Sequence, residues 1–307
     1  MRIIISGGTG LVGAALAAAL VADPSNERYE VILLSRDPDR HIGRAPAGAK
    51  LVKWDAQSSA GWGHLVEGAD AIVNLAGANL SEGRWSEGRK KLIVESRIKA
   101  GQAVVEAVAQ ANQKPKLVIQ PSGVDFYGVH GAEELTEVDE GGEGFLSEVT
   151  KVWEESTLPV ESFGVRRVVY RGAVVLARQG GALPKILLPF RFFVGGRLGS
   201  GEQWFSWVHL KDQVAAMRFF IENPETSGVY NLSSPNPVQN KELARTIGKV
   251  MRRPAFIPVP AFAIRLMFGE MAITVLGGQR VLPDRLQKAG FNFSYPTIEQ
   301  ALGDLLG

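Results

Sequence analysis

The 307-residue sequence contains no cysteine and only four histidines. Without cysteine, the chain has no disulfide, no thiol nucleophile and no thiolate metal ligand. The histidines are not spaced as a set of metal ligands; they are His41, His64, His130 and His209. These absences exclude thiol chemistry and give no support for a metal centre.

An excess of one charge and a long apolar run are also absent. The chain has 34 Lys and Arg against 32 Asp and Glu, a formal charge of +2, so no nucleic-acid partner is expected. No uninterrupted apolar run is long enough to span a membrane, and the first residues predict a strand rather than a charged leader. We therefore expect a soluble, cytoplasmic protein without a membrane partner, with an organellar form that has lost its leader as the alternative.

A strand, a glycine-rich turn and a helix are predicted in the first twenty residues. Three consecutive isoleucines in 2–6 favour a buried strand, and small helix-forming residues fill 14–20. Glycines between them let a pyrophosphate approach the backbone at the positive end of the helix. A glycine turn that binds nothing is the alternative. The residues expected to contact a dinucleotide here are Gly7, Thr9, Gly10, Leu11, Val12 and Gly13.

The end of the second predicted strand, 30–34, indicates which dinucleotide is bound. An acidic residue at this place would accept hydrogen bonds from a free ribose 2′-hydroxyl, but Ser35 and Arg36 stand there instead. A hydroxyl and a guanidinium suit the 2′-phosphate of NADP(H). The acidic Asp37 that follows weakens this prediction. The alternative is that Arg36 is an ordinary solvated side chain at the end of a strand. Asp55 follows the third strand, where related folds contact the adenine.

Strands continue to alternate with helices, which predicts an α/β fold with a doubly wound parallel sheet. Ligands bind such sheets at the carboxyl ends of the strands. The fourth strand ends in Leu75, Ala76 and Gly77, whose small size lets the backbone run along the cofactor ribose. We expect a dinucleotide-binding domain of residues 1–165 plus 208–234, and a smaller C-terminal lobe of 166–207 plus 235–307.

Several motifs together resemble a known family. They include GGTGLVG with glycines at 7, 10 and 13, LAGANL from Leu75, the corner SGVDFYG from Ser122, and GSGEQWFSWVHLKD from Gly199. The chain resembles the epimerase-like atypical short-chain dehydrogenases, which are NAD(P)-binding proteins often labelled nucleoside-diphosphate-sugar epimerases. The resemblance spans nearly the whole chain. It implies a Rossmann fold of the extended short-chain type that prefers NADP(H).

The resemblance also supplies candidate catalytic residues. Ser122 matches a serine that hydrogen-bonds the reacting oxygen in short-chain dehydrogenases. Their catalytic tyrosine stands four residues before a lysine, whereas Lys151 has Ser147 at that place, and a serine hydroxyl is far too weakly acidic to replace a phenol. Tyr127 is either a substitute acid or a wall of the pocket. Lys151 is either a ribose ligand or an ordinary exposed lysine.

Other residues of the family motifs are expected near the nicotinamide end of the pocket. Arg84, Trp85 and Arg97 have no counterpart in ordinary epimerases. We assign Arg97 to the cofactor, and Asn79, Arg84, Trp85 and Tyr127 to the substrate pocket.

Two classes of function follow. The leading one is an NADP(H)-dependent oxidoreductase or epimerase that acts on a small polar or sugar-like molecule. The second is a non-catalytic NADP(H)-binding sensor or scaffold, with a link to cell division because some bacterial relatives carry a cell-division-inhibitor label. Binding of flavin or NAD(H) is a third, weaker option. Both a monomer and a homodimer are compatible with the sequence.

Overall fold

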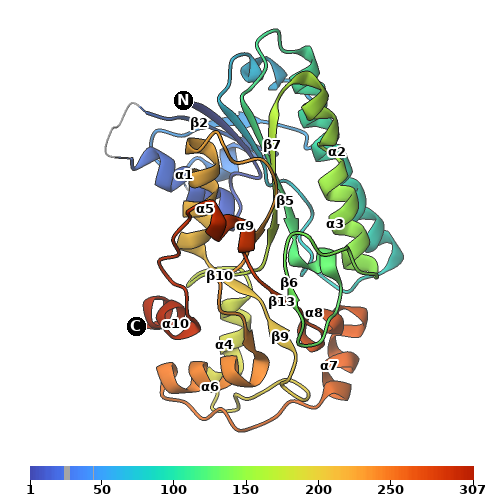
Figure 1. Cartoon of the computed structure of the whole chain (residues 1–307), viewed down its shortest axis with the longest axis vertical. Coiled ribbons are helices and arrows are strands. Elements are labelled where there is room, and N and C mark those ends of the chain that lie inside the picture. Colours follow the sequence, from blue (N-terminus) through green and yellow to red (C-terminus); the bar gives the residue numbers. More distant parts are fainter. Residues whose placement is uncertain (24–27, 44) are drawn as a thin grey trace.

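A seven-stranded sheet forms the centre of the computed structural model, which describes residues 1–23, 28–43 and 45–307 (Figure 1). Its order is β11-β7-β5-β4-β1-β2-β3, and every neighbouring pair is parallel. The strands are β1 (Arg2–Ser6), β2 (Glu30–Ser35), β3 (Lys50–Lys53), β4 (Ala71–Asn74), β5 (Leu117–Gly123), β7 (Arg166–Gly172) and β11 (Gly228–Leu232). The strand order reverses between β1 and β4, and ligands bind open α/β sheets at such a switch point.

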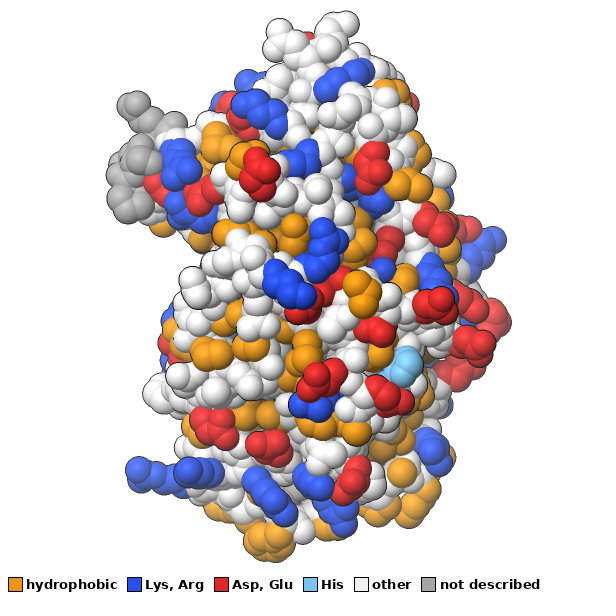
Figure 2. All heavy atoms as spheres, in the orientation of Figure 1, with side chains coloured by type: hydrophobic (Ala, Val, Ile, Leu, Met, Phe, Trp, Pro, Cys, Tyr) orange, Lys and Arg blue, Asp and Glu red, His pale blue; other side chains and the backbone are white. Residues whose placement is uncertain are grey.

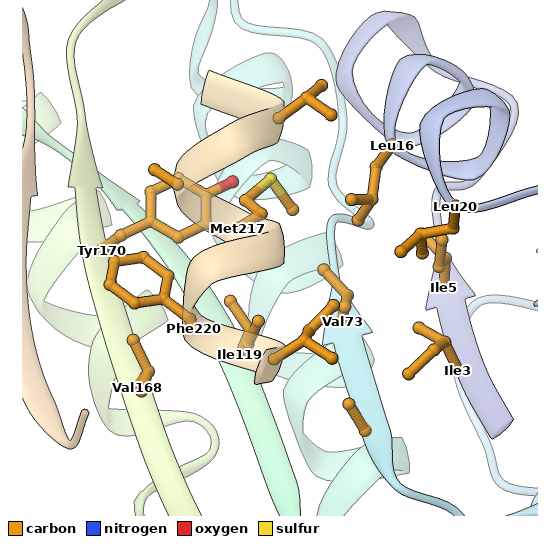
Figure 3. Packing of buried hydrophobic residues seen from close by; sticks show 14 of the residues in the cluster. Ile3, Ile5, Leu16, Leu20, Val73, Ile119, Val168, Tyr170, Met217 and Phe220 are labelled. Atoms are coloured by element: carbon orange, nitrogen blue, oxygen red, sulfur yellow. The ribbon is translucent and has the colours of Figure 1, made fainter. Parts of the chain in front are cut away.

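Helices cover both faces of the sheet, as the run of isoleucines in β1 requires. Ile3 and Ile5 point to one face, where they share a core with α1 (Leu11–Val21) and α5 (Leu210–Glu222) (Figure 3). Ile4 points to the other face, against α2 (Glu87–Gln110). The helix α3 (Phe145–Glu155) packs beside α2 and β5. The prediction of a doubly wound parallel sheet is confirmed.

A smaller lobe lies below the sheet in Figure 1. Its own core contains Phe190, Trp207, Ile247 and Leu302. The lobe and its connections consist of β8 (Val174–Leu176), α4 (Leu183–Arg191), β9 (Trp204–Phe205), β10 (Trp207–His209), β12 (Val238–Gln239), α6 (Asn240–Met251), α7 (Ala261–Phe268), α8 (Ile273–Leu276) and α10 (Ile298–Leu306). A short pair, β6 (Glu134–Leu135) with β13 (Arg280–Val281), joins the corner after β5 to the C-terminal part.

The expected domain boundaries differ from the observed ones at two places. The sequence places residues 166–172 in the smaller lobe, but they form β7 of the large sheet, between β5 and β11. The helix α9 (Asp284–Lys288) and Phe291 also return to the sheet domain, since Leu286 and Phe291 lie in its core. The chain therefore enters and leaves the smaller lobe more often than its sequence suggests.

The smaller lobe exposes apolar side chains on α7. Phe262 and Leu266 are 72% and 76% exposed. Figure 2 shows orange side chains next to blue ones at the lower end of the molecule. No helix in the described parts of the chain is long and apolar enough to cross a membrane.

Candidate functional site

The glycine turn between β1 and α1 has a shape that only glycine permits. Gly7 has φ +63°, and a Cβ there would lie 2.8 Å from the Leu75 carbonyl oxygen. A Cβ on Gly13 would lie 2.6 Å from the Gly7 carbonyl oxygen and 2.7 Å from Gly8 Cα. The helix therefore packs directly on the turn. No side chain caps its first N–H groups at Gly10, so they are available to an anion.

A chain of buried polar side chains fixes the ends of three strands beside this turn. Ser6 Oγ donates to Asn74 Oδ1 at 2.8 Å, and Asn74 Nδ2 donates to Gln120 Oε1 at 2.9 Å. All three residues are fully buried. Ser6 Oγ also accepts from the Ala76 N–H at 3.2 Å, which places the loop after β4. Sequence reasoning missed this network, although each residue is the first polar one after an apolar run of its strand.

At the end of β2, Arg36 is exposed and has no hydrogen-bond or ion-pair partner among the described residues. The neighbouring Asp37 carboxylate accepts from the Arg40 N–H at 3.3 Å, and the Asp37 N–H donates to Ser35 Oγ. Asp37 is therefore engaged in its own turn, while Arg36 is available to a ligand. Asp55 also closes a local turn, because its carboxylate accepts from the Gln57 and Ser58 N–H groups.

Two buried polar groups near the carboxyl ends of β4 and β5 have unused hydrogen-bonding capacity. Ser122 is 7% exposed, and its Oγ has no partner in the described structure. Arg97 on α2 is 4% exposed; its Nη1 donates to the Ala78 carbonyl at 3.2 Å, but its Nε has no acceptor. Unsatisfied buried groups are costly, so both favour a ligand that supplies partners.

Arg97 is also a buried cation without a carboxylate partner among the described residues. Its guanidinium lies 4.5 Å from the centroid of the Trp153 ring, and its side chain lies against Gly77. Burial, together with the smaller effect of the nearby Arg89 charge, lowers the pKa of Arg97 to about 10. Arg97 stays protonated at neutral pH, so an anion beside the loop after β4 would be stabilised.

Tyr127 does not face a pocket, contrary to both roles considered for it. The residue is fully buried, its hydroxyl donates to Asn231 Oδ1 at 2.7 Å, and it accepts from Arg171 Nη1 at 3.0 Å. Burial raises the pKa of Tyr127, which opposes loss of its proton. Arg171 in turn pairs with Glu154 at 2.9 Å. Tyr127 therefore ties the corner after β5 to β7 and β11.

Removing this hydroxyl tests the structural role. We expect Tyr127→Phe to lower the free energy of unfolding by about 1 to 3 kcal/mol, because buried Asn231 and Arg171 each lose a partner. Dinucleotide binding should not change. Urea unfolding of the variant beside the wild type measures the loss. A variant as stable as the wild type would contradict the role of the Tyr127 hydroxyl in tying the corner after β5 to β7 and β11.

Arg84 and Trp85 connect the loop before α2 to other elements, rather than standing free in a pocket. Arg84 Nη2 donates to the carbonyls of Leu266 and Met267 at the end of α7, at 3.1 and 3.2 Å. The Trp85 indole packs edge-on against Phe145 and is 8% exposed. These contacts hold the loop against the smaller lobe and α3.

Asn79 and Lys151 likewise have partners within the protein. The Asn79 side chain accepts from the Ser81 N–H at 2.9 Å. Lys151 Nζ donates to the Gly142 carbonyl at 2.7 Å, and Ser147 Oγ donates to the same carbonyl at 2.7 Å. Ser147 is therefore fixed to the backbone beside the corner after β5. One of the three ammonium protons of Lys151 is used, so a second contact with a ribose stays a prediction.

A cleft of about 490 Å³ lies between the corner after β5 and the smaller lobe. Val129, Arg265, Glu270 and Ile273 are among the residues that line it. An apolar wall with a few charged groups is typical of sites for small molecules. No group of three or more His, Asp or Glu side chains within the described residues could hold a metal ion.

A parallel sheet with a glycine turn at its switch point is the architecture of the NAD(P)-binding Rossmann proteins. Residues 3–144 match the NAD dependent epimerase/dehydratase family, and residues 259–305 match a domain of unknown function. An epimerase family protein of Staphylococcus haemolyticus is 37% identical over 99% of both chains. The epimerase family protein YfhF of Bacillus subtilis is 36% identical over 100% of this chain and 98% of its own. The chain therefore belongs to this epimerase family of atypical short-chain dehydrogenases.

A solved structure agrees with this assignment. Human epimerase family protein SDR39U1 (isoform 2), crystallised with NADPH, superposes with a TM-score of 0.88 at 35% identity. The match covers 100% of this chain and 99% of the human one.

Proposed function

We propose that the protein is an NADP(H)-dependent oxidoreductase or epimerase that acts on a small polar or sugar-like substrate. The observation that carries this proposal is the unpartnered, buried Ser122 hydroxyl at the carboxyl end of β5, in a sheet whose glycine turn suits a dinucleotide. A buried hydroxyl without a partner in the protein is suited to hold the oxygen of a reacting carbonyl or alcohol. The nicotinamide supplies hydride chemistry when the cofactor is bound.

The residues around the switch point are suited to hold each part of such a cofactor: its pyrophosphate, ribose, adenine and nicotinamide. The first N–H groups of α1 and the Gly7 turn would hold the pyrophosphate, with Arg97 as its counter-charge beside Gly77. Leu75 and Ala76 would follow the ribose, and Asp55 the adenine. The nicotinamide would then reach Ser122, since β5 lies on the opposite side of β1 from β2.

The preference for NADP(H) over NAD(H) rests on the end of β2. Arg36 is exposed and unpaired, and the nearby Asp37 carboxylate is engaged in its own turn. A guanidinium without a carboxylate partner suits a phosphate more than a hydroxyl. The human relative that was crystallised with NADPH supports the same preference.

Titrations with NADPH and NADH, followed by a NADPH-consumption assay on small aldehydes, ketones and hydroxyketones, test the proposal. We expect tight binding of NADPH, weaker binding of NADH, and turnover of at least one polar carbonyl compound that falls about 10- to 1,000-fold in Ser122→Ala. A protein that binds neither dinucleotide would refute the proposal.

A non-catalytic sensor or scaffold is the second candidate. It is favoured by one observation: the position of the usual catalytic tyrosine is occupied by Ser147, whose hydroxyl is bonded to backbone carbonyls. NADPH binding without turnover of any carbonyl or alcohol probe would support this candidate instead.

A further inference from the structure

The exposed apolar side chains of the described chain gather on the smaller lobe. Ten of the eighteen large apolar residues that are exposed lie in two short segments, 183–201 and 243–269. The first segment contains α4 and the turn after it, and the second contains most of α6, the connection from α6 to α7, and α7 itself. We call the two segments together the basic apolar edge. Large apolar side chains that cluster in water mark a binding surface.

Contacts between the two segments join them into one surface. The Ile257 N–H donates to the Gly195 carbonyl at 3.2 Å, so the connection before α7 runs beside the turn after α4. The Arg253 guanidinium lies 4.3 Å from the centroid of the Phe193 ring. In Figure 1, α6, α7 and the connection between them form the lower end of the molecule. The basic apolar edge is therefore a continuous surface at this end.

The helix α7 has the reverse of the usual polarity for a surface helix. Its one buried residue is Ile264, whereas Phe262, Leu266 and Met267 are exposed. A surface helix of a globular protein normally carries polar residues on its outer side. Arg265 is the only charged residue of α7, and it is also exposed. Large apolar side chains beside a cation are typical of helices that lie at the surface of a membrane.

The charges of the basic apolar edge all have one sign. Its two segments contain eight Lys and Arg and no Asp or Glu, although the whole chain has 34 of the first kind and 32 of the second. All eight cationic residues are exposed, and none of them forms an ion pair with a described acidic residue. Neighbouring cations add their fields, so this surface attracts a surface of negative charge.

The backbone of the basic apolar edge is strained at two residues. Phe193 has φ +61° and Arg252 has φ +55°, and they are two of the three non-glycine residues with positive φ in the described chain. Each follows the end of a helix, where glycine is the residue that adopts this conformation without strain. Strained residues gather at functional sites, so a phenylalanine and an arginine at these positions favour a role for their side chains.

We propose that the basic apolar edge binds the surface of an anionic membrane, with its apolar side chains among the acyl chains and its cations at the lipid phosphates. A second copy of the chain suits the edge less, because a symmetric contact would bring two sets of cations together. The sequence-based expectation of no membrane partner rested on the absence of a spanning run, and peripheral binding needs none. The inference does not depend on the proposed function.

Flotation of the full chain with lipid vesicles tests the inference. We expect binding to vesicles of phosphatidylcholine and phosphatidylglycerol in a ratio of roughly 7:3, little binding to phosphatidylcholine alone, and release at about 0.5 M salt. In Phe262→Gln with Leu266→Gln, the lipid concentration for half-maximal binding should rise about tenfold or more, because insertion of apolar side chains is lost. Absence of binding to the anionic vesicles, or equal binding to both compositions, would overturn the inference.

A second pair of substitutions tests the cations separately. Arg252→Gln with Arg253→Gln should weaken binding to the anionic vesicles and reduce its dependence on salt. The matched control is Val138→Gln with Leu158→Gln, which removes two apolar side chains that are exposed outside the edge and should leave vesicle binding unchanged. An equal loss of binding in this control and in the Phe262 and Leu266 variant would overturn the inference.

Sedimentation and dinucleotide titration complete the test. Every substituted side chain is exposed, so each variant should keep the Tm and the NADPH affinity of the wild type. A wild-type dimer that Phe262→Gln with Leu266→Gln dissociates would show that a second copy covers the edge, and binding of a short DNA duplex in place of vesicles would show a nucleic-acid surface. Either result would overturn the inference, whereas loss of NADPH binding in the wild type would refute only the proposed function.

Discussion

Replacing Arg36 with alanine should weaken NADPH binding by about 10- to 100-fold and leave NADH binding unchanged. The reason is that a guanidinium contributes charge-assisted hydrogen bonds to the 2′-phosphate, worth about 1.5 to 3 kcal/mol, and NADH has no such phosphate. Arg36 has no partner among the described residues that would be left unpaired, so the fold should be unaffected. Titration of nicotinamide fluorescence with each dinucleotide measures the ratio of the two affinities.

A matched control is available on the smaller lobe. Arg191 at the end of α4 is exposed like Arg36 but lies on a different element, so Arg191→Ala should not change either affinity. Equal losses for NADPH and NADH in Arg36→Ala would contradict the assignment of the 2′-phosphate. Stronger salt dependence of NADPH binding than of NADH binding in the wild type would agree with it.

Replacing Gly13 with alanine should raise the Kd for NADPH by about 100-fold or more, so that no binding is detected below about 100 times the wild-type Kd. The added Cβ would lie 2.6 Å from the Gly7 carbonyl oxygen and 2.7 Å from Gly8 Cα, both of which are backbone atoms. The helix must then move away from the turn, which removes the N–H groups from the phosphates and lowers the free energy of unfolding by roughly 1 to 3 kcal/mol. Heat stabilisation by NADPH, measured by differential scanning fluorimetry, should disappear.

The control for this variant is another helical glycine. Gly303 lies in α10, and a Cβ there meets nothing within 4 Å. Gly303→Ala should raise the free energy of unfolding by up to about 1 kcal/mol, because alanine is the better helix former, and should bind NADPH normally. If Gly13→Ala behaved like Gly303→Ala, the close packing of α1 on the turn would not be needed for the dinucleotide.

The features that sequence predicts well here are local ones. The glycines of the first turn and the buried isoleucines of β1 each lie within one short segment, so their spacing carries the structural information. The parallel doubly wound sheet follows from the alternation of such segments. These predictions agree with the structure because both faces of the sheet are covered by the helices that the sequence places between the strands.

The features that sequence missed depend on contacts between distant residues. The SGVDFYG corner suggests a site role for Tyr127, yet the partner of its hydroxyl, Asn231, lies 104 residues further along the chain. Arg84 likewise contacts Leu266, 182 residues away.

The predicted domain boundary between residues 165 and 166 differs from the structure for a related reason. Residues 166–172 and 174–176 are separated by a single residue in sequence, but the first part pairs with β5 and the second pairs with β10 of a separate two-stranded sheet. The partner of a strand, rather than its own composition, decides which domain it belongs to.

A crystal structure of the protein grown with NADPH tests the central claim most directly. The account predicts a pyrophosphate at the first N–H groups of α1, the 2′-phosphate within hydrogen-bonding distance of Arg36, and the nicotinamide ring beside Ser122. A dinucleotide bound elsewhere, or bound with its 2′-phosphate away from Arg36 and its nicotinamide away from β5, would contradict it.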